Sequence, residues 1–317
     1  MAGSSFGNYF RIHTFGESHG AALGAIVDGC PAGLAISEED IQKYLDRRKP
    51  GQSSITTQRS EADKANILSG VFEGVTTGTP IAITINNTSQ RSKDYSDLAN
   101  VYRPGHADMT FDAKYGIRDY RGGGRSSGRE TAARVAGGAI AAKMLGEMGI
   151  SLCAYTKSIG PVAIDPERFD PSLITKTPTS MPDALANTQA EEYIHKCMEE
   201  KDSVGGVIEC IIKGLPKGLG EPVFDKLDAL LSQAVMSVGA VKAVEIGDGC
   251  AVAGSKGSLN NDPFTKDGKL TNHSGGTLGG MSDGSDLILR AYIKPTPSIF
   301  REQQTINRDG EEVSLTI

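Results

Sequence analysis

The pattern of apolar and polar positions is most unusual near the middle of the chain. From residue 129 to residue 148, small and apolar residues leave no wide polar face. An amphipathic surface helix would show such a face, so we predict a helix that is buried on most sides. Gly137 and Gly138 would each cost about 1 kcal/mol relative to alanine within a helix, which indicates close packing against them. A membrane span requires an uninterrupted apolar run of about 20 residues. This segment does not provide one, because three charged residues interrupt it: Arg134, Lys143 and Glu147.

A second pattern occurs twice along the chain. An apolar strand leads into Gly-x-Pro-x-Gly-Leu at residues 29–34 and again at residues 214–219. Each copy is followed by a helical pattern and later by another strand. The repeated order of elements predicts an internal duplication, with halves of about 1–150 and 151–317.

Periodicity and capping residues predict the remaining elements. After the first repeat, Ser37 and Asp40 have the spacing of a capping box, and the helix is expected to end at the basic residues 47–49. Two further helices are predicted over residues 183–201 and 222–238. Strands are predicted over residues 24–28, 66–74, 80–86, 204–213, 240–247, 286–294 and 311–317. Strands and helices do not strictly alternate, so we expect an α+β fold with helices packed between sheets.

Charge and cysteine usage narrow the possible partners. The 317 residues carry a formal net charge of −6, which argues against a general nucleic-acid binder. Basic residues nevertheless gather at positions 47–49 and 118–134, as is typical of a cleft for a small polyanion. The five cysteines contain no CxxC pair, so we expect no metal site and a reducing, cytoplasmic location. The first residues show no signal peptide.

The most informative segment is residues 121–131, which combines three consecutive glycines and two serines with three arginines. Ser127 and Glu130 have capping-box spacing, so a helix should begin there. A helix start presents unpaired N–H groups and a partial positive charge, and Arg125 and Arg129 add forked donors for a phosphate or carboxylate. The alternative is an ordinary capped helix whose arginines are solvated. A helix cap of that kind, however, requires neither three glycines nor three arginines.

Two loops place a histidine on tightly turned backbone. His19 lies between glycines in residues 14–20, and His106 lies in residues 103–108. Histidine exchanges protons near neutral pH, so the loops suggest a site that binds phosphate and moves a proton, although a surface histidine is the common alternative. A Ser18-based hydrolase is rejected because no nucleophile elbow is present. Neither a dinucleotide-binding nor a P-loop motif occurs.

These segments together closely resemble chorismate synthase, over nearly the whole chain. The motifs are FGESHG at 15–20, DRRKPGQ at 46–52, RPGHAD at 103–108, KYGIRDYRGGGRSSGRET at 114–131 and KPTPSI at 294–299. The resemblance implies a carbon-oxygen lyase of the shikimate pathway, which converts 5-enolpyruvylshikimate 3-phosphate to chorismate by 1,4-anti elimination of phosphate. It implies a requirement for reduced FMN without net redox change. It also implies a single domain of two related halves, built as a β-α-β sandwich with helices between two antiparallel sheets, and a homotetramer.

The resemblance also assigns roles to particular residues. His19 would protonate the leaving phosphate, and His106 would keep the flavin in the right protonation state. The substrate's phosphate and carboxylates would be bound by Arg48, Arg103 and Arg129. The residues expected to contact FMN are Arg125, Ser126, Ser127, Gly239, Ala240, Gly279, Lys294, Pro295, Thr296, Pro297 and Ser298.

The chain departs from the family pattern in three places. Ser54 stands where many bacterial members have arginine, and Gly239 where asparagine is common. A Gly-Arg-His-Asp-Pro-Cys motif and a following apolar helix, present in family members, are not in these 317 residues. The alternative function is therefore a catalytically impaired form that binds flavin or polyanions. No insertion for an NADPH:flavin reductase activity is apparent, so reduced FMN is expected from an external flavin reductase or another source.

Overall fold

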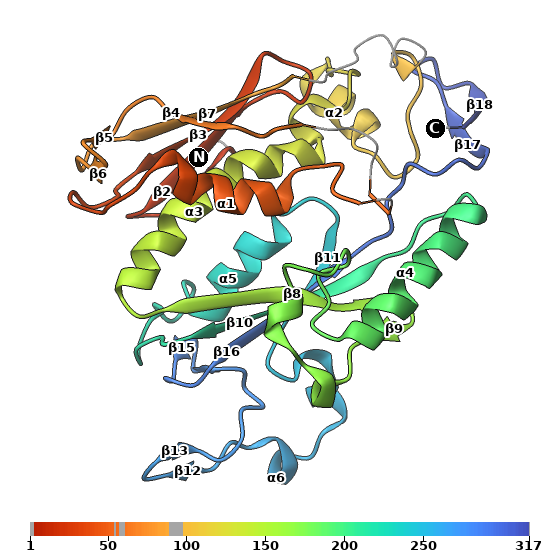
Figure 1. Ribbon diagram of the computed structural model, residues 1–317. Coiled ribbons are helices and arrows are strands. Elements are labelled where there is room, and N and C mark those ends of the chain that lie inside the picture. The colour runs from red at the N-terminus through yellow and green to blue at the C-terminus, as the bar shows by residue number, and fades with distance from the viewer. Residues whose placement is uncertain (1–2, 54, 57–60, 89–97, 317) are drawn as a thin grey trace. The chain divides into compact units, whose positions relative to one another are not determined.

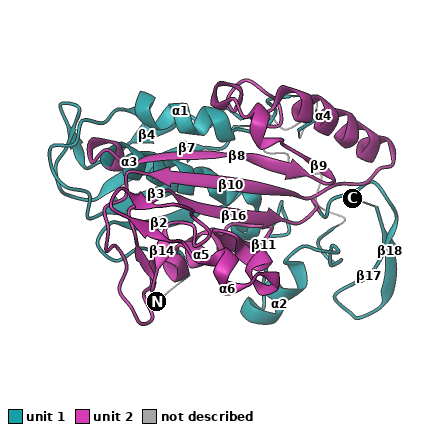
Figure 2. Ribbon diagram, turned by 90° about the horizontal axis from the view of Figure 1, so that it is seen from below, with its two compact units in different colours: residues 1–144, 297–317 teal, residues 145–296 magenta. Residues whose placement is uncertain are grey.

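The computed structural model describes residues 3–53, 55–56, 61–88 and 98–316. The chain forms two compact units (Figure 2), one of Met1–Met144 with Pro297–Ile317 and the other of Leu145–Thr296. Each unit contains its own five-stranded antiparallel sheet. Helices with antiparallel sheets confirm the predicted α+β class, and the packing of helices between the two sheets stays a prediction.

The sheet of the first unit has the strand order β1-β2-β3-β7-β4. Alternate residues of its central strands point into the core, as the two-residue period of a strand requires. Leu23 of β3 lies opposite Ile85 of β7, and Val27 lies opposite Ile81; all four side chains are buried. The strands are β1 (Ser5–Phe6), β2 (Arg11–Gly16), β3 (Ala22–Asp28), β4 (Ala65–Ile67) and β7 (Ile81–Asn86).

Two helices cover one face of this sheet (Figure 1). The first, α1 (Glu38–Arg48), begins at the predicted capping box of Ser37 and Asp40. The second, α3 (Thr131–Glu147), buries six of its small or apolar residues. A Cβ on Gly137 would lie 2.4 Å from Ile12 Cδ1, whereas a Cβ on Gly138 would meet nothing within 4 Å. Close packing therefore explains Gly137 but not Gly138.

The start of α3 differs from the prediction. Residues Gly128–Glu130 form a 3₁₀ turn, and the α-helix begins only at Thr131. Ser127 does cap the turn, accepting a hydrogen bond from Arg129 N. The capping box is not completed, because the Glu130 carboxylate instead accepts hydrogen bonds from Thr14 Oγ1 and from Arg134 Nε.

Shorter elements complete the first unit. They are β5 (Val71–Phe72), β6 (Val75–Thr76), α2 (Asp108–Tyr115), the 3₁₀ turn Gly124–Ser126, β17 (Gln303–Ile306) and β18 (Glu312–Leu315). The single strand predicted over residues 66–74 is wrong. Gly70, with a φ of +80°, turns the chain after β4 into the β5–β6 hairpin.

The second unit has the strand order β11-β16-β10-β8-β9. Its strands are β8 (Ser151–Ile159), β9 (Val162–Ala163), β10 (Gly206–Lys213), β11 (Val241–Ile246) and β16 (Leu287–Ile293). Helix α5 (Leu227–Met236) packs on the sheet's apolar residues. It begins five residues later than predicted, because Glu221 and Asp225 pair in a bridge before it. Helix α4 (Ala184–Glu199) matches the prediction and packs against Met181.

The remaining elements of this unit are short. They are the 3₁₀ turns Pro166–Arg168, Pro171–Leu173 and Gly249–Gly254, α6 (Gly257–Asn260), the hairpin β12 (Phe264–Thr265) with β13 (Gly268–Lys269), and the hairpin β14 (Thr277–Leu278) with β15 (Met281–Ser282). The order β2-β3-β7-β4 corresponds to β8-β10-β16-β11, with a helix after β3 and after β10. This correspondence supports the proposal of an internal duplication. No helix of the described residues is long and apolar enough to cross a membrane.

Candidate active site

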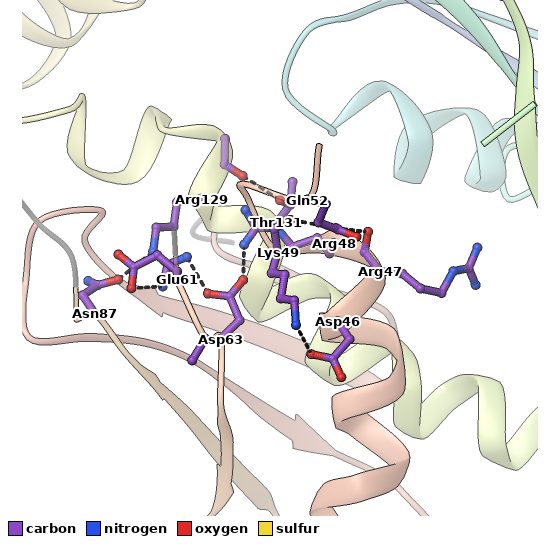
Figure 3. Close-up of polar contacts among 12 residues, drawn as sticks. Asp46, Arg47, Arg48, Lys49, Gln52, Glu61, Asp63, Asn87, Arg129 and Thr131 are labelled. Atoms are coloured by element: carbon purple, nitrogen blue, oxygen red, sulfur yellow. Dashed lines mark hydrogen bonds and ion pairs between the residues drawn. The ribbon is translucent and has the colours of Figure 1, made fainter. Parts of the chain in front are cut away.

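A buried carboxylate joins two of the predicted substrate-binding arginines (Figure 3). Asp63 Oδ2 lies 2.6 Å from Nη1 of Arg48, in the last turn of α1, and Asp63 Oδ1 lies 2.6 Å from Nη1 of Arg129. Asp63 is 1% exposed and has a φ of +45°, which is uncommon for a residue other than glycine. The contacts fix both guanidinium groups in place before any ligand is present.

Arg129 keeps hydrogen-bonding capacity in this cluster. Its Nη2 is buried and has no hydrogen-bond acceptor among the described residues, with Glu61 Oε2 3.9 Å away. A buried donor without an acceptor is unfavourable, and a phosphate or carboxylate would satisfy it. The donor set therefore fits an anionic ligand.

An asparagine that the sequence analysis did not identify links Arg129 to the predicted acid. Asn87 follows β7, its Oδ1 accepts a 2.7 Å hydrogen bond from Arg129 Nε, and its Nδ2 donates to the carbonyls of Glu17 and Gly20. Those two carbonyls flank Ser18 and His19. The only signal in the sequence was a polar residue directly after an apolar strand.

The glycine-rich segment, residues 121–131, lies directly against the turn of residues 17–20, which is called the His19 turn below. His19 is 8% exposed. A Cβ on Gly122 would lie 2.3 Å from His19 Cε1, and a Cβ on Gly124 would lie 2.6 Å from Glu17 Oε2. Both glycines have positive φ, so glycine is required here for conformation and for close approach. Burial raises the pKa of the Glu17 carboxyl, against the opposing effect of the Arg125 charge.

The Arg103 loop lies beside the same glycines. A Cβ on Gly123 would lie 3.6 Å from Arg103 Nη2. Arg103 is buried and makes a forked pair with Asp108, with both N···O distances 2.8 Å. Burial alone would raise the pKa of Asp108, but hydrogen bonds from the side chain and backbone of Arg103 outweigh it and hold that pKa below its ordinary value.

His106 contacts another predicted site residue. Its Nδ1 lies 3.0 Å from the carbonyl oxygen of Pro104, and its Nε2 lies 3.2 Å from Ser298 Oγ. A carbonyl only accepts, so Nδ1 carries a proton. In the neutral ring Nε2 is then the acceptor, and Ser298 donates to it.

Three of the residues predicted to bind FMN use their side chains for hydrogen bonds within the protein. They are Arg125, Ser126 and Ser127. Arg125 donates to Thr14 Oγ1 at 2.7 Å and to the carbonyls of Thr14 and Gly16. Ser126 Oγ donates to the Gly123 carbonyl at 2.7 Å, and Ser127 caps the following turn. These bonds hold the shape of the segment, and contact with FMN stays a prediction.

The other predicted FMN residues lie mainly in the second unit. Ala240, with a φ of +71°, follows Gly239, and its carbonyl accepts a hydrogen bond from Lys294 N at 2.9 Å. Thr296 O accepts from Ser203 Oγ at 2.7 Å. A Cβ on Gly205 would lie 3.2 Å from Pro295 Cδ, Gly279 lies in the β14–β15 turn, and Pro297 begins the C-terminal segment of the first unit. Ser54 lies outside the described residues.

The first unit thus joins five of the predicted residues through one series of contacts: Arg48, Arg129, His19, Arg103 and His106. Two buried arginines and a third in the last turn of α1, joined in this way to two histidines, have the chemistry to bind a polyanion and to transfer a proton. No group of three histidine, cysteine, aspartate or glutamate side chains in the described part of the chain could hold a metal ion.

Comparison with known proteins identifies the family. The chorismate synthase family profile matches residues 10–317. The chorismate synthases of Lachnoclostridium phytofermentans and Agathobacter rectalis are each 60% identical to the chain, covering 100% of it and 88% of their own lengths. A crystal structure of chorismate synthase, 34% identical, superposes with a TM-score of 0.75 and covers 91% of this chain and 85% of its own. The chain belongs to the chorismate synthase family.

Family membership confirms the predicted function. Chorismate synthases are lyases of the shikimate pathway that eliminate phosphate from 5-enolpyruvylshikimate 3-phosphate, and they use reduced FMN. The alternative, an impaired form that only binds flavin or polyanions, is not supported by these relatives. Reduced FMN supplies the electron-rich ring that the reaction requires.

Proposed function

We propose that the cluster in the first unit is the catalytic site, with His19 as the acid that protonates the departing phosphate. The observation that carries this proposal is the link through Asn87, which holds the His19 turn against Arg129. An acid beside an anion-binding guanidinium is positioned to transfer its proton to a phosphate oxygen.

Arg48, Arg103 and Arg129 are proposed to bind the substrate's phosphate and two carboxylates. Three anionic groups require several strong donors, and guanidinium groups bind such groups with two parallel hydrogen bonds. Asp63 and Asp108 already orient these arginines. Less side-chain freedom is therefore lost when substrate binds.

His106 is proposed to lie beside the flavin and to control its protonation. The support is its fixed tautomer, set by the Pro104 carbonyl, and its contact with Ser298. We also propose that FMN contacts the residues predicted above, namely Arg125, Ser126, Ser127, Gly239, Ala240, Gly279 and residues 294–298. The left-handed backbone of Ala240 supports this proposal, because strained residues are enriched at ligand sites.

Three further properties are proposals that rest on the family and on composition. We propose a homotetramer, a cytoplasmic location and a supply of reduced FMN from a separate flavin reductase. The five cysteines are all free thiols, as expected in a reducing compartment.

Phosphate release under strict anaerobiosis tests the proposed function. The chain should release phosphate from 5-enolpyruvylshikimate 3-phosphate with reduced FMN and should not do so with oxidised FMN. Sustained turnover with oxidised FMN in the absence of any reductant would refute the proposal.

A further inference from the structure

We infer that Asn87 is a positioning residue that couples the proton donor His19 to the anion-binding Arg129. The inference rests on the proposed roles of those two residues. Asn87 itself is not a catalytic residue, because its contacts are with the His19 turn and with Arg129.

The amide nitrogen of Asn87 closes the turn that carries His19. Asn87 Nδ2 donates to the Glu17 carbonyl at 3.0 Å and to the Gly20 carbonyl at 2.8 Å. The backbone N–H of Asn87 donates to the Ala21 carbonyl at 3.1 Å. Three hydrogen bonds from one residue therefore hold both ends of the five-residue segment 17–21, which contains His19. With Gly122 packed on the ring, the imidazole of His19 has a fixed position.

The amide oxygen of the same side chain orients the arginine. Asn87 Oδ1 accepts a 2.7 Å hydrogen bond from Arg129 Nε, while Arg129 Nη1 bonds to Asp63. Figure 3 shows the contacts of Asn87 and Asp63 with the Arg129 guanidinium group. Nη2 has no hydrogen-bond acceptor among the described residues and lies 3.9 Å from Glu61 Oε2, so it can still donate to an incoming anion. One planar amide therefore sets the separation between proton donor and anion.

No other side chain of this size meets these requirements. The carbonyls of Glu17 and Gly20 accept only, and Arg129 Nε donates only, so the amide has one allowed orientation. Aspartate would keep the bond to Arg129 but would turn an oxygen toward the two carbonyls. Alanine would remove all three side-chain bonds.

The sheet does not depend on these bonds. Asn87 follows β7, whose buried residues Ile81, Ile83 and Ile85 make the core contacts of that strand. The side chain of Asn87 instead bonds only to the His19 turn and to Arg129 in the contacts described above. Its loss should therefore affect the reaction more than the fold. A displacement of about 1 Å in a catalytic group can lower a rate by about 100-fold.

The test compares Asn87→Asp and Asn87→Ala with the control Asn66→Asp. Asn66, on β4, also donates through Nδ2 to backbone carbonyls, those of Lys64 and Thr84, but lies outside the site. We expect both Asn87 variants to lower kcat about 100-fold, with a change in KM of less than about 10-fold, and the control to keep normal kinetics. An Asn87→Asp enzyme with normal kcat would overturn the inference.

A double variant distinguishes coupling from general damage. If Asn87 acts through His19, Asn87→Asp combined with His19→Ala should be no slower than His19→Ala alone. Multiplied losses would overturn the inference. The measurements use the full chain with reduced FMN and substrate.

A readout without turnover separates this inference from the proposed function. We expect inorganic phosphate to raise the pKa of His19, followed by NMR on ¹³C-histidine-labelled protein, because a nearby anion favours the imidazolium. The change in the His19 pKa that phosphate causes should be at least halved in Asn87→Ala and should be unaltered in Asn66→Asp. If His19→Ala keeps normal turnover, the acid assignment fails, but loss of the phosphate-induced shift in Asn87→Ala still supports the coupling. An unaltered shift overturns it.

Discussion

Asp63 Oδ1 lies 2.6 Å from Arg129 Nη1, across 66 residues of sequence, and the same carboxylate bonds to Arg48. One buried anion thus organises two of the three arginines proposed to bind substrate. The arrangement makes Asp63 important for stability as well as for substrate affinity.

Asp63→Asn should destabilise the protein strongly. Removing one partner of a buried ion pair costs about 3–5 kcal/mol because the remaining charge is left uncompensated. Denaturant unfolding measures the change. The control is Asp46→Asn, whose partner Lys49 is exposed, and that variant should lose at most about 1 kcal/mol. Equal losses in the two variants would contradict the role of Asp63.

Gly122→Ala should lower turnover by displacing His19. The new Cβ would lie 2.3 Å from the imidazole, and we expect kcat to fall at least about 100-fold. Gly116→Ala is the matched control, since Gly116 also has positive φ, +74° against +69°, but has open space around its Cβ position. Both substitutions introduce similar backbone strain. Normal turnover in Gly116→Ala would therefore show that the loss in Gly122→Ala comes from the displacement of His19. Similar kcat losses in both variants would attribute it to strain alone.

Gly137→Ala and Gly138→Ala should change stability in opposite directions. Alanine at position 138 meets open space and should stabilise α3 by about 1 kcal/mol through helix propensity. Alanine at position 137 would contact Ile12 at 2.4 Å, and overpacking of a core typically costs about 1–3 kcal/mol. Thermal unfolding of the two variants checks the prediction. A stabilised Gly137→Ala protein would show that α3 is not packed closely on β2.

Asp108→Asn should lower stability at pH 7 but not in strong acid. Because the folded-state pKa of Asp108 lies below its ordinary value of 3.8, its contribution is present above that value and is lost as pH falls through the lower folded-state pKa. The difference in unfolding free energy between wild type and variant should therefore narrow below about pH 3.8. A difference that is constant from pH 7 to pH 2 would show that the charge of Asp108 is not responsible.

The elements that the sequence predicts correctly depend on local interactions. The capping box of Ser37 and Asp40 sets the start of α1, and alternation of apolar residues sets β3 and β7. The start of α3 was predicted two residues early, because Glu130 bonds to Thr14, which lies 116 residues away. No local pattern reveals such a partner.

In the candidate site, too, local motifs were predictable and partners distant in sequence were not. Motifs identified the histidines and arginines, but Asn87 and Asp63 were missed because their partner Arg129 lies 42 and 66 residues away. The basic residues at positions 47–49 and 118–134 were interpreted as typical of a cleft for a small polyanion, but the Arg118 side chain bonds within the protein. Its guanidinium pairs with Asp112 and donates to the carbonyls of Leu98, Ala99 and Val101. A count of charges could not distinguish a structural arginine from a binding one.

The most direct test of the account is phosphate release by His19→Ala with reduced FMN in a single turnover. General acid catalysis contributes about 10²- to 10⁴-fold, so the rate should fall by a factor in that range. Substrate affinity should change far less, because the arginines still bind the anions. A His19→Ala enzyme that releases phosphate at close to the wild-type rate would contradict the central claim that His19 is the proton donor.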